Sequence, residues 1–222
     1  MSLWQIKNMK LKICGMKYPE NILEIANLKP DYLGFIFWEK SSRFFQSTIP
    51  ELPKSILKVG VFVDESLDKI ISKVKQFKLD LVQLHGNESI SFCKQLKSEI
   101  ENINKVEIRI IKAFSVDSNF DFQTLNNYEQ VCDYFLFDTK GKLPGGNGTT
   151  FNWNLLEKYK LNKPYFLSGG IGLQEITKIK DFTKSDISKN CIAIDVNSKF
   201  EIKPGLKNEK ELSQFKKELN EN

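Results

Sequence analysis

Short apolar runs alternate with longer helix-like segments along the whole chain, and this alternation limits the folds open to it. Eight runs of four to seven residues are rich in Val, Ile, Leu or Phe, as expected for buried parallel strands. Several of them end in a polar residue or a glycine pair. The predicted strands are Leu11–Cys14, Tyr32–Phe37, Lys58–Val63, Leu81–Leu84, Glu107–Ala113, Tyr134–Asp138, Tyr165–Ser168 and Ile192–Val196.

The segments between and after these strands predict seven helices. Pro19 suits the first position of a helix, and Asn87 or Ser89 can cap the third helix. Between the second and third strands, two prolines within residues 47–55 predict a short or broken helix. The predicted helices are Pro19–Leu28, Leu67–Phe77, Ser89–Ile100, Phe122–Tyr128, Trp153–Tyr159, Leu173–Ile179 and Glu209–Leu219.

Strand and helix repeated eight times predict an α/β fold in which a parallel sheet closes on itself, a (β/α)8 or TIM barrel. The length of 222 residues suits one such domain. We expect it over residues 11–222, with residues 1–10 forming an N-terminal extension or a tag remnant. Because connections between parallel strands are right-handed, the carboxyl ends of the strands share one rim, where the active sites of barrels lie.

Composition disfavours several classes of function. The net charge is +5 and the basic residues are spread along the chain, which favours an anionic small-molecule substrate over nucleic acid. No apolar run reaches the roughly 18 residues of a membrane span. The cysteines are far apart and form no CxxC pair, so we expect no metal site and free thiols in the cytoplasm. They are Cys14, Cys93, Cys132 and Cys191.

Two strand ends carry residues suited to proton transfer. Cys14 is equally consistent with a small buried hydrophobe and with a thiol on the rim. As a base it needs a cationic neighbour, and Lys12 has the same strand parity. Asp138 is consistent with a residue that braces the following loop or with a general acid. For the acid, we expect burial beside Phe135 and Phe137 to raise its pKa.

Two further candidates are cationic or titratable. Arg43 follows the second strand, where its planar guanidinium suits a carboxylate or a phosphate. His85 is the only histidine of the chain. Because no GxSxG elbow accompanies it, we favour a structural or substrate-lining role over catalysis.

The loops after the seventh and eighth strands predict a phosphate site. Gly169 and Gly170 allow backbone N–H groups to approach an anion, and Asn197 and Ser198 lie at the equivalent place after the last strand. Barrels commonly bind phosphate at these two loops. No GxGxxG or GxxxxGK[ST] motif occurs, so the sequence predicts no nucleotide cofactor. The glycine-rich segment Lys140–Thr150 is the candidate lid.

Seven motifs in chain order resemble those of phosphoribosylanthranilate isomerase, and they cover nearly all of the chain from Leu11 onward. They are Lys12-Ile13-Cys14-Gly15, Gly34-Phe35-Ile36-Phe37 with Ser42-Arg43, Val59-Gly60-Val61-Phe62-Val63, Val82-Gln83-Leu84-His85-Gly86, Phe137-Asp138 with Gly145-Gly146-Asn147-Gly148-Thr149-Thr150-Phe151, Leu167-Ser168-Gly169-Gly170, and Ile194-Asp195-Val196-Asn197-Ser198 with Pro204-Gly205.

This resemblance implies an isomerase of tryptophan biosynthesis that needs neither metal nor cofactor. The implied reaction is an Amadori rearrangement with Asp138 as general acid and Cys14 as general base. Arg43 would pair with the anthranilate carboxylate, and the two late loops would hold the phosphate. A homodimer and an association with a neighbouring pathway enzyme are the two alternatives for protein partners.

The chain departs from the pattern of this family at three places. Lys199 replaces a glycine after Asn197-Ser198, Thr149 replaces a lysine, and Asn152 replaces an aspartate. These changes affect the binding loops more than the catalytic pair. Two other interpretations are a different phosphate-binding barrel, such as indole-glycerol-phosphate synthase or the histidine-pathway isomerase, and an inactive barrel kept as a binding protein. The Cys14 and Asp138 pair argues against the first, and the presence of Cys14, Asp138 and Arg43 together argues against the second.

Overall fold

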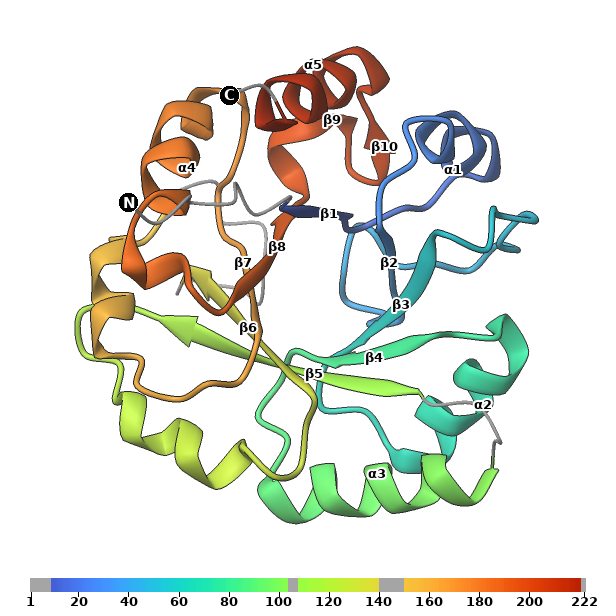
Figure 1. Cartoon of the computed structure of the whole chain (residues 1–222). Coiled ribbons are helices and arrows are strands. Elements are labelled where there is room, and N and C mark those ends of the chain that lie inside the picture. Colours follow the sequence, from blue (N-terminus) through green and yellow to red (C-terminus); the bar gives the residue numbers. More distant parts are fainter. Residues whose placement is uncertain (1–8, 104–107, 140–149, 221–222) are drawn as a thin grey trace.

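The computed structural model describes residues 9–103, 108–139 and 150–220. Eight parallel strands form a closed barrel in the order β1 to β8, with helices around the outside (Figure 1). The predicted (β/α)8 fold is therefore confirmed. The strands are β1 (Lys10–Ile13), β2 (Tyr32–Ile36), β3 (Leu57–Phe62), β4 (Leu81–Leu84), β5 (Arg109–Val116), β6 (Tyr134–Thr139), β7 (Tyr165–Leu167) and β8 (Cys191–Val196).

The barrel closes where β1 pairs with β8, and Lys12 lies opposite Asp195 in this register. Since successive side chains of a strand point to opposite faces, each strand contributes to two cores. Val59, Leu136 and Phe166 belong to the smaller core inside the barrel. Leu33 and Phe135 belong to the larger core between the strands and the surrounding helices.

Within the ranges that the structure describes, five α-helices cover the outside of the barrel, and several begin as the sequence predicts. Pro19 occupies the first turn of α1. The Ser89 hydroxyl accepts a hydrogen bond from Phe92 N at 3.2 Å, as a cap of α3 should. The helices are α1 (Pro19–Ala26), α2 (Leu67–Phe77), α3 (Ile90–Ile103), α4 (Ile176–Thr183) and α5 (Glu209–Asn220).

Two predicted helices are 3₁₀ turns instead, η1 (Phe122–Tyr128) and η2 (Trp153–Lys158). In η2 the buried residues Trp153 and Leu156 are three positions apart, which matches the three-residue turn of a 3₁₀ helix. The predicted helix over 173–179 is divided in the same way, because η3 (Leu173–Glu175) precedes α4. The shorter turns η4 (Asp186–Ser188) and η5 (Ser198–Phe200) complete this class.

The segment between β2 and β3 contains no helix at all, whereas its two prolines predicted a short or broken one. An aromatic cluster covers this part of the barrel instead. Phe45 is 1% exposed, and its ring lies 5.1 Å from that of Phe35 and 5.7 Å from that of Phe77.

A two-stranded hairpin, β9 (Glu201–Lys203) and β10 (Leu206–Lys207), follows the last barrel strand and was not predicted. The expected N-terminal extension lies outside the described residues except for Met9 and Lys10. The candidate lid Lys140–Thr150 also lies outside them, apart from Thr150. In the described ranges, no helix combines the length and apolarity needed to cross a membrane.

Candidate active site

All eight side chains or glycines predicted for the site line one cleft at the carboxyl ends of the strands, with about 670 Å³ of space including its open mouth. Its lining combines apolar side chains with a few charged and polar groups, as in sites that bind small molecules. Strand parity explains the arrangement. Residues at or just after a strand end that share the parity of its inward-facing residues point into the cleft. The eight residues are Cys14, Arg43, His85, Asp138, Gly169, Gly170, Asn197 and Ser198.

Cys14 lies directly after β1 and is 5% exposed. Burial raises the pKa of its thiol, and the charge of Lys12 and a hydrogen bond from it oppose this effect. Lys12 is wholly buried, and its ammonium lies 2.9 Å from Asp195 Oδ1. Although burial opposes the charge on Lys12, Asp195 and Cys14 raise the pKa of the ammonium above its ordinary value. The expected cationic neighbour of Cys14 is therefore present.

Asp195 is a cleft residue that the sequence analysis did not select. It belongs to β8, is 5% exposed and accepts a hydrogen bond from the Ser168 hydroxyl at 3.2 Å. Burial raises the pKa of its carboxyl group, and Lys12 opposes the increase. Asp195 is the one charged residue of an otherwise apolar strand, and it has the same inward parity as Asn197. These two features of the sequence could have identified it.

Asp138 lies near the end of β6 and is 3% exposed. Its Oδ1 accepts a hydrogen bond from Thr139 N at 2.8 Å. The expected setting of this carboxyl group was wrong in one respect. Phe135 and Phe137 have the opposite parity and belong to the outer core, so they do not line the cleft beside Asp138.

His85 stands beside this carboxylate, with its Nε2 3.3 Å from Asp138 Oδ2. The other ring nitrogen, Nδ1, is 2.8 Å from Gln83 Nε2. Within the described part of the chain, His85 Nε2 and Gln83 Oε1 are buried without a hydrogen-bond partner. The His85 nitrogen can therefore exchange a hydrogen bond with a molecule in the cleft, whereas the Gln83 carbonyl oxygen can only accept one.

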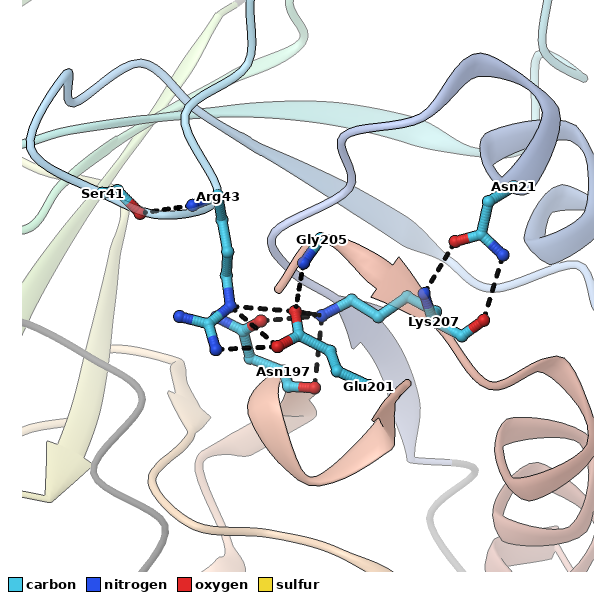
Figure 2. A network of polar contacts seen from close by, with 7 residues as sticks. All are labelled: Asn21, Ser41, Arg43, Asn197, Glu201, Gly205 and Lys207. Carbon is cyan, nitrogen blue, oxygen red and sulfur yellow. Dashed lines mark hydrogen bonds and ion pairs between the residues drawn. The ribbon is translucent and has the colours of Figure 1, made fainter. Parts of the chain in front are cut away.

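Arg43 enters the cleft from the loop after β2, and its guanidinium binds the carboxylate of Glu201, with Nη2 2.7 Å from Oε2 (Figure 2). The ammonium of Lys207 lies 2.8 Å from the other oxygen of the same carboxylate. The sequence pattern indicates Arg43 but neither of these partners, because they belong to the unpredicted hairpin.

The glycines after β7 bring the backbone close to β6. Gly169 has φ +95°, and a Cβ atom there would lie 2.2 Å from Thr139 Oγ1 and 2.9 Å from Asp138 Oδ1. Gly170 has φ +65°. Only glycine fits this close approach, so Gly169 is required for packing as well as for any contact with an anion. Lys199 also lines the cleft.

The arrangement supports proton transfer on an anionic molecule. A thiol beside a cation and a carboxyl group beside an imidazole lie in one cleft, and a guanidinium and two loop backbones lie near them. Among the described residues, no three His, Cys, Asp or Glu side chains are placed to share a metal ion.

A family model described as N-(5'-phosphoribosyl)anthranilate (PRA) isomerase matches residues 11–218. The N-(5'-phosphoribosyl)anthranilate isomerase of Parabacteroides distasonis is 40% identical over 213 residues, which cover 93% of this chain and 91% of the relative. That of Phocaeicola vulgatus is 38% identical over 211 residues, which cover 95% of this chain and 98% of the relative.

Solved structures give the same result. The phosphoribosyl anthranilate isomerase of Thermotoga maritima is similar with a TM-score of 0.77 and 30% identity, covering 95% of this chain and 98% of that chain. A phosphoribosyl anthranilate isomerase in complex with reduced 1-(o-carboxyphenylamino)-1-deoxyribulose 5-phosphate has a TM-score of 0.75, 29% identity and the same coverage. The similarity extends over the whole barrel and is not confined to one motif.

Proposed function

Because the chain belongs to the N-(5'-phosphoribosyl)anthranilate isomerase family, we propose that Cys14 and Asp138 carry the acid–base chemistry of this activity. The enzyme is an isomerase of tryptophan biosynthesis. It converts N-(5-phosphoribosyl)anthranilate to 1-(2-carboxyphenylamino)-1-deoxyribulose 5-phosphate by an Amadori rearrangement. The placement of Cys14 and Asp138 in one cleft, with Lys12 against the thiol, is the observation that carries the assignment of roles.

The proposed reaction has two proton-transfer stages. Asp138 protonates the ring oxygen of the ribose while the bond from C1 to that oxygen breaks, which leaves a Schiff base between C1 and the anthranilate nitrogen. The Cys14 thiolate then removes the proton from C2, and the electron pair of that bond forms the enolamine. Tautomerisation gives the ketone at C2 and a second hydrogen at C1. Lys12 supports the second stage because its charge favours the thiolate.

The remaining predicted residues bind the two anionic ends of the substrate in this proposal. Arg43 pairs with the anthranilate carboxylate, and His85 lines the cleft beside the acid. The phosphate lies against the loops that follow β7 and β8, where Gly169, Gly170, Asn197 and Ser198 contribute. No metal or cofactor takes part.

We expect Cys14→Ala and Asp138→Ala each to lower turnover at least about a hundredfold, since a positioned acid or base contributes on this scale. The assay uses freshly made phosphoribosylanthranilate. Cys93→Ala, which changes a buried cysteine outside the cleft, and Asp68→Ala, which changes an exposed carboxylate of α2, serve as matched controls. Near-normal rates in both site variants would refute the roles. A wild-type chain without turnover would favour the binding-protein interpretation.

We further propose that the catalytic domain spans residues 11–222 and acts in the cytoplasm. The four free cysteines support a reducing compartment. The domain's protein partner is either a second copy of this chain, in a homodimer, or a neighbouring pathway enzyme. A Thermotoga maritima relative is described as a dimeric enzyme. Sedimentation of the purified chain separates them, since a dimer sediments at twice the monomer mass without any other protein.

A further inference from the structure

The hairpin after the barrel reaches the active-site cleft through two buried charged residues. β9 and β10 pair antiparallel, and Lys207 lies opposite Glu201 in their register. Neither strand belongs to the barrel sheet. Asn21 of α1 fixes the hairpin in place, because its side chain accepts a hydrogen bond from Lys207 N at 2.8 Å and donates one to Lys207 O at 3.0 Å (Figure 2).

Glu201 holds Arg43 along one edge of the guanidinium. Arg43 Nε lies 2.8 Å and 3.0 Å from the two carboxylate oxygens, and Nη2 lies 2.7 Å from Oε2. A guanidinium has five N–H donors in a fixed plane. The bonds to Glu201 use the Nε edge, so among the described residues the edge formed by Nη1 and the second N–H of Nη2 is left for another carboxylate. Arg43 lines the cleft, where a ligand can meet this edge.

Lys207 completes the network from the buried side. Its side chain is wholly buried, and its ammonium has three partners, Glu201 Oε1 at 2.8 Å, Asn197 Oδ1 at 2.7 Å and Asn197 O at 3.2 Å. These contacts use all three N–H donors of a lysine. Lys207 therefore links Glu201, which holds Arg43, to Asn197, the first residue of the loop after β8.

The charges of the network leave Arg43 able to bind an anion. Burial alone would raise the pKa of Glu201, but hydrogen bonds from Arg43 and Lys207 hold it below its ordinary value, so the carboxylate is ionised. Burial lowers the pKa of Lys207 to about 8, so the ammonium is still mostly charged at neutral pH and one negative charge lies between two cations. Arg43 is therefore oriented by Glu201 without being neutralised, and the cluster keeps a net positive charge for the substrate.

The network also touches the residue beside the proposed base. Gly15 follows Cys14 and has φ +77°, and a Cβ atom there would lie 2.6 Å from Asn197 Oδ1 and 2.8 Å from Arg43 Cδ. Arg43 and Asn197 thus pack over the same glycine. A displaced Arg43 would therefore change the space beside Gly15, next to Cys14, in which the substrate binds.

We propose that Glu201, held by Lys207, is a positioning residue that fixes the free edge of Arg43 toward the substrate carboxylate. This inference rests on the proposed function, because it takes Arg43 as the carboxylate ligand. Glu201 itself does not touch the substrate. Its effect on the reaction passes through Arg43, and this is the property that a test must measure.

The test is a double-variant cycle with Glu201→Gln and Arg43→Ala. Glutamine has the same shape, but its NH₂ group faces an N–H donor of Arg43 or Lys207, so one edge of the network breaks. We expect Glu201→Gln to raise KM about tenfold and to change kcat less than about threefold, because orientation of a binding group is lost. In the Arg43→Ala background the same change should alter kcat/KM less than about twofold, since residues that act through one another are not additive.

A second readout isolates the carboxylate. Reduced 1-(o-carboxyphenylamino)-1-deoxyribulose 5-phosphate and the same compound without the ring carboxylate are titrated by calorimetry. Glu201→Gln should weaken the first about tenfold and the second less than about twofold. Glu65→Gln, which changes a partly exposed ion pair with Lys69 outside the cleft, is the matched control and should leave both affinities unchanged. If Glu201→Gln does not fold, Glu201→Asp keeps the charge one methylene further away and enters the same cycle.

The outcomes separate this inference from the proposed function. If Arg43→Ala leaves kcat/KM unchanged, the carboxylate role of Arg43 fails and the inference fails with it. If Arg43→Ala lowers kcat/KM but Glu201→Gln has its full effect in that background, or weakens both ligands equally, the proposed function stands and the positioning role is wrong.

Discussion

Cys14 ionises in an environment that three charged side chains share. Lys12 on β1 and Lys207 on β10 lower the pKa of its thiol, whereas burial and Asp195 on β8 raise it. Burial is the largest of these effects. The chain itself indicated Lys12 by strand parity, but the extent of burial and the presence of Lys207 depend on packing between distant segments.

The pH profile tests this environment. A basic thiolate requires loss of the proton, so kcat/KM should rise with pH toward the pKa of Cys14, and a raised pKa places that rise on the alkaline side of neutrality. In Lys12→Met/Asp195→Asn the rise should move to higher pH, because Lys12 affects the thiol more strongly than Asp195 does. A rise that stays in place or moves to lower pH would contradict the role of Lys12. Lys69→Met is the control.

The next scale is that of the elements, where β1 and β8 close the barrel. Lys12 and Asp195 face each other across this seam, 183 positions apart in the chain. The local apolar runs predicted the eight strands. They did not predict that η1 and η2 are 3₁₀ turns or that β9 and β10 form a hairpin, because short turns and a two-stranded hairpin carry little periodicity. The conformation of these segments depends on how they pack against the barrel.

The stability of this seam gives a second prediction. Lys12→Met leaves the Asp195 carboxyl buried without its cation, and we expect a loss of about 3–5 kcal/mol in the free energy of unfolding, measured by urea denaturation. Lys12→Met/Asp195→Asn should cost clearly less than the sum of the single changes, since no unpaired charge remains. Additive losses would show that the pair is not coupled. The partly exposed Lys69–Glu65 pair is the control, at about 1 kcal/mol or less.

At the scale of the whole molecule, the cleft is assembled from residues that follow most of the strands. Cys14, His85, Asp138 and Asn197 come from four different βα units. A ligand that contacts them together binds only the closed barrel. The unfolded chain has no equivalent site, so binding energy becomes folding stability.

This coupling predicts thermal stabilisation by a product analogue. Reduced 1-(o-carboxyphenylamino)-1-deoxyribulose 5-phosphate at about 100 times its Kd should add about 2.7 kcal/mol, which corresponds to roughly 5–10 °C in Tm for a chain of this size. Scanning calorimetry measures the shift. Arg43→Ala should show a smaller shift at the same concentration. An unchanged Tm with the wild type would mean that the analogue does not bind the cleft.

The amino-acid sequence by itself determined the barrel, the single domain and the strand ends that form the rim. These follow from the period of apolar residues and from strand parity, which are local properties of the chain. Only the tertiary structure decided that Asp195 pairs with Lys12 and that Glu201 and Lys207 hold Arg43. Arg43 and Glu201 are 158 positions apart, and their contact exists because the barrel closes and the hairpin folds back over its rim. Burial removes water from the charged side chains of both networks. The ion-pair partner of each side chain then determines its charge and its orientation toward the cleft.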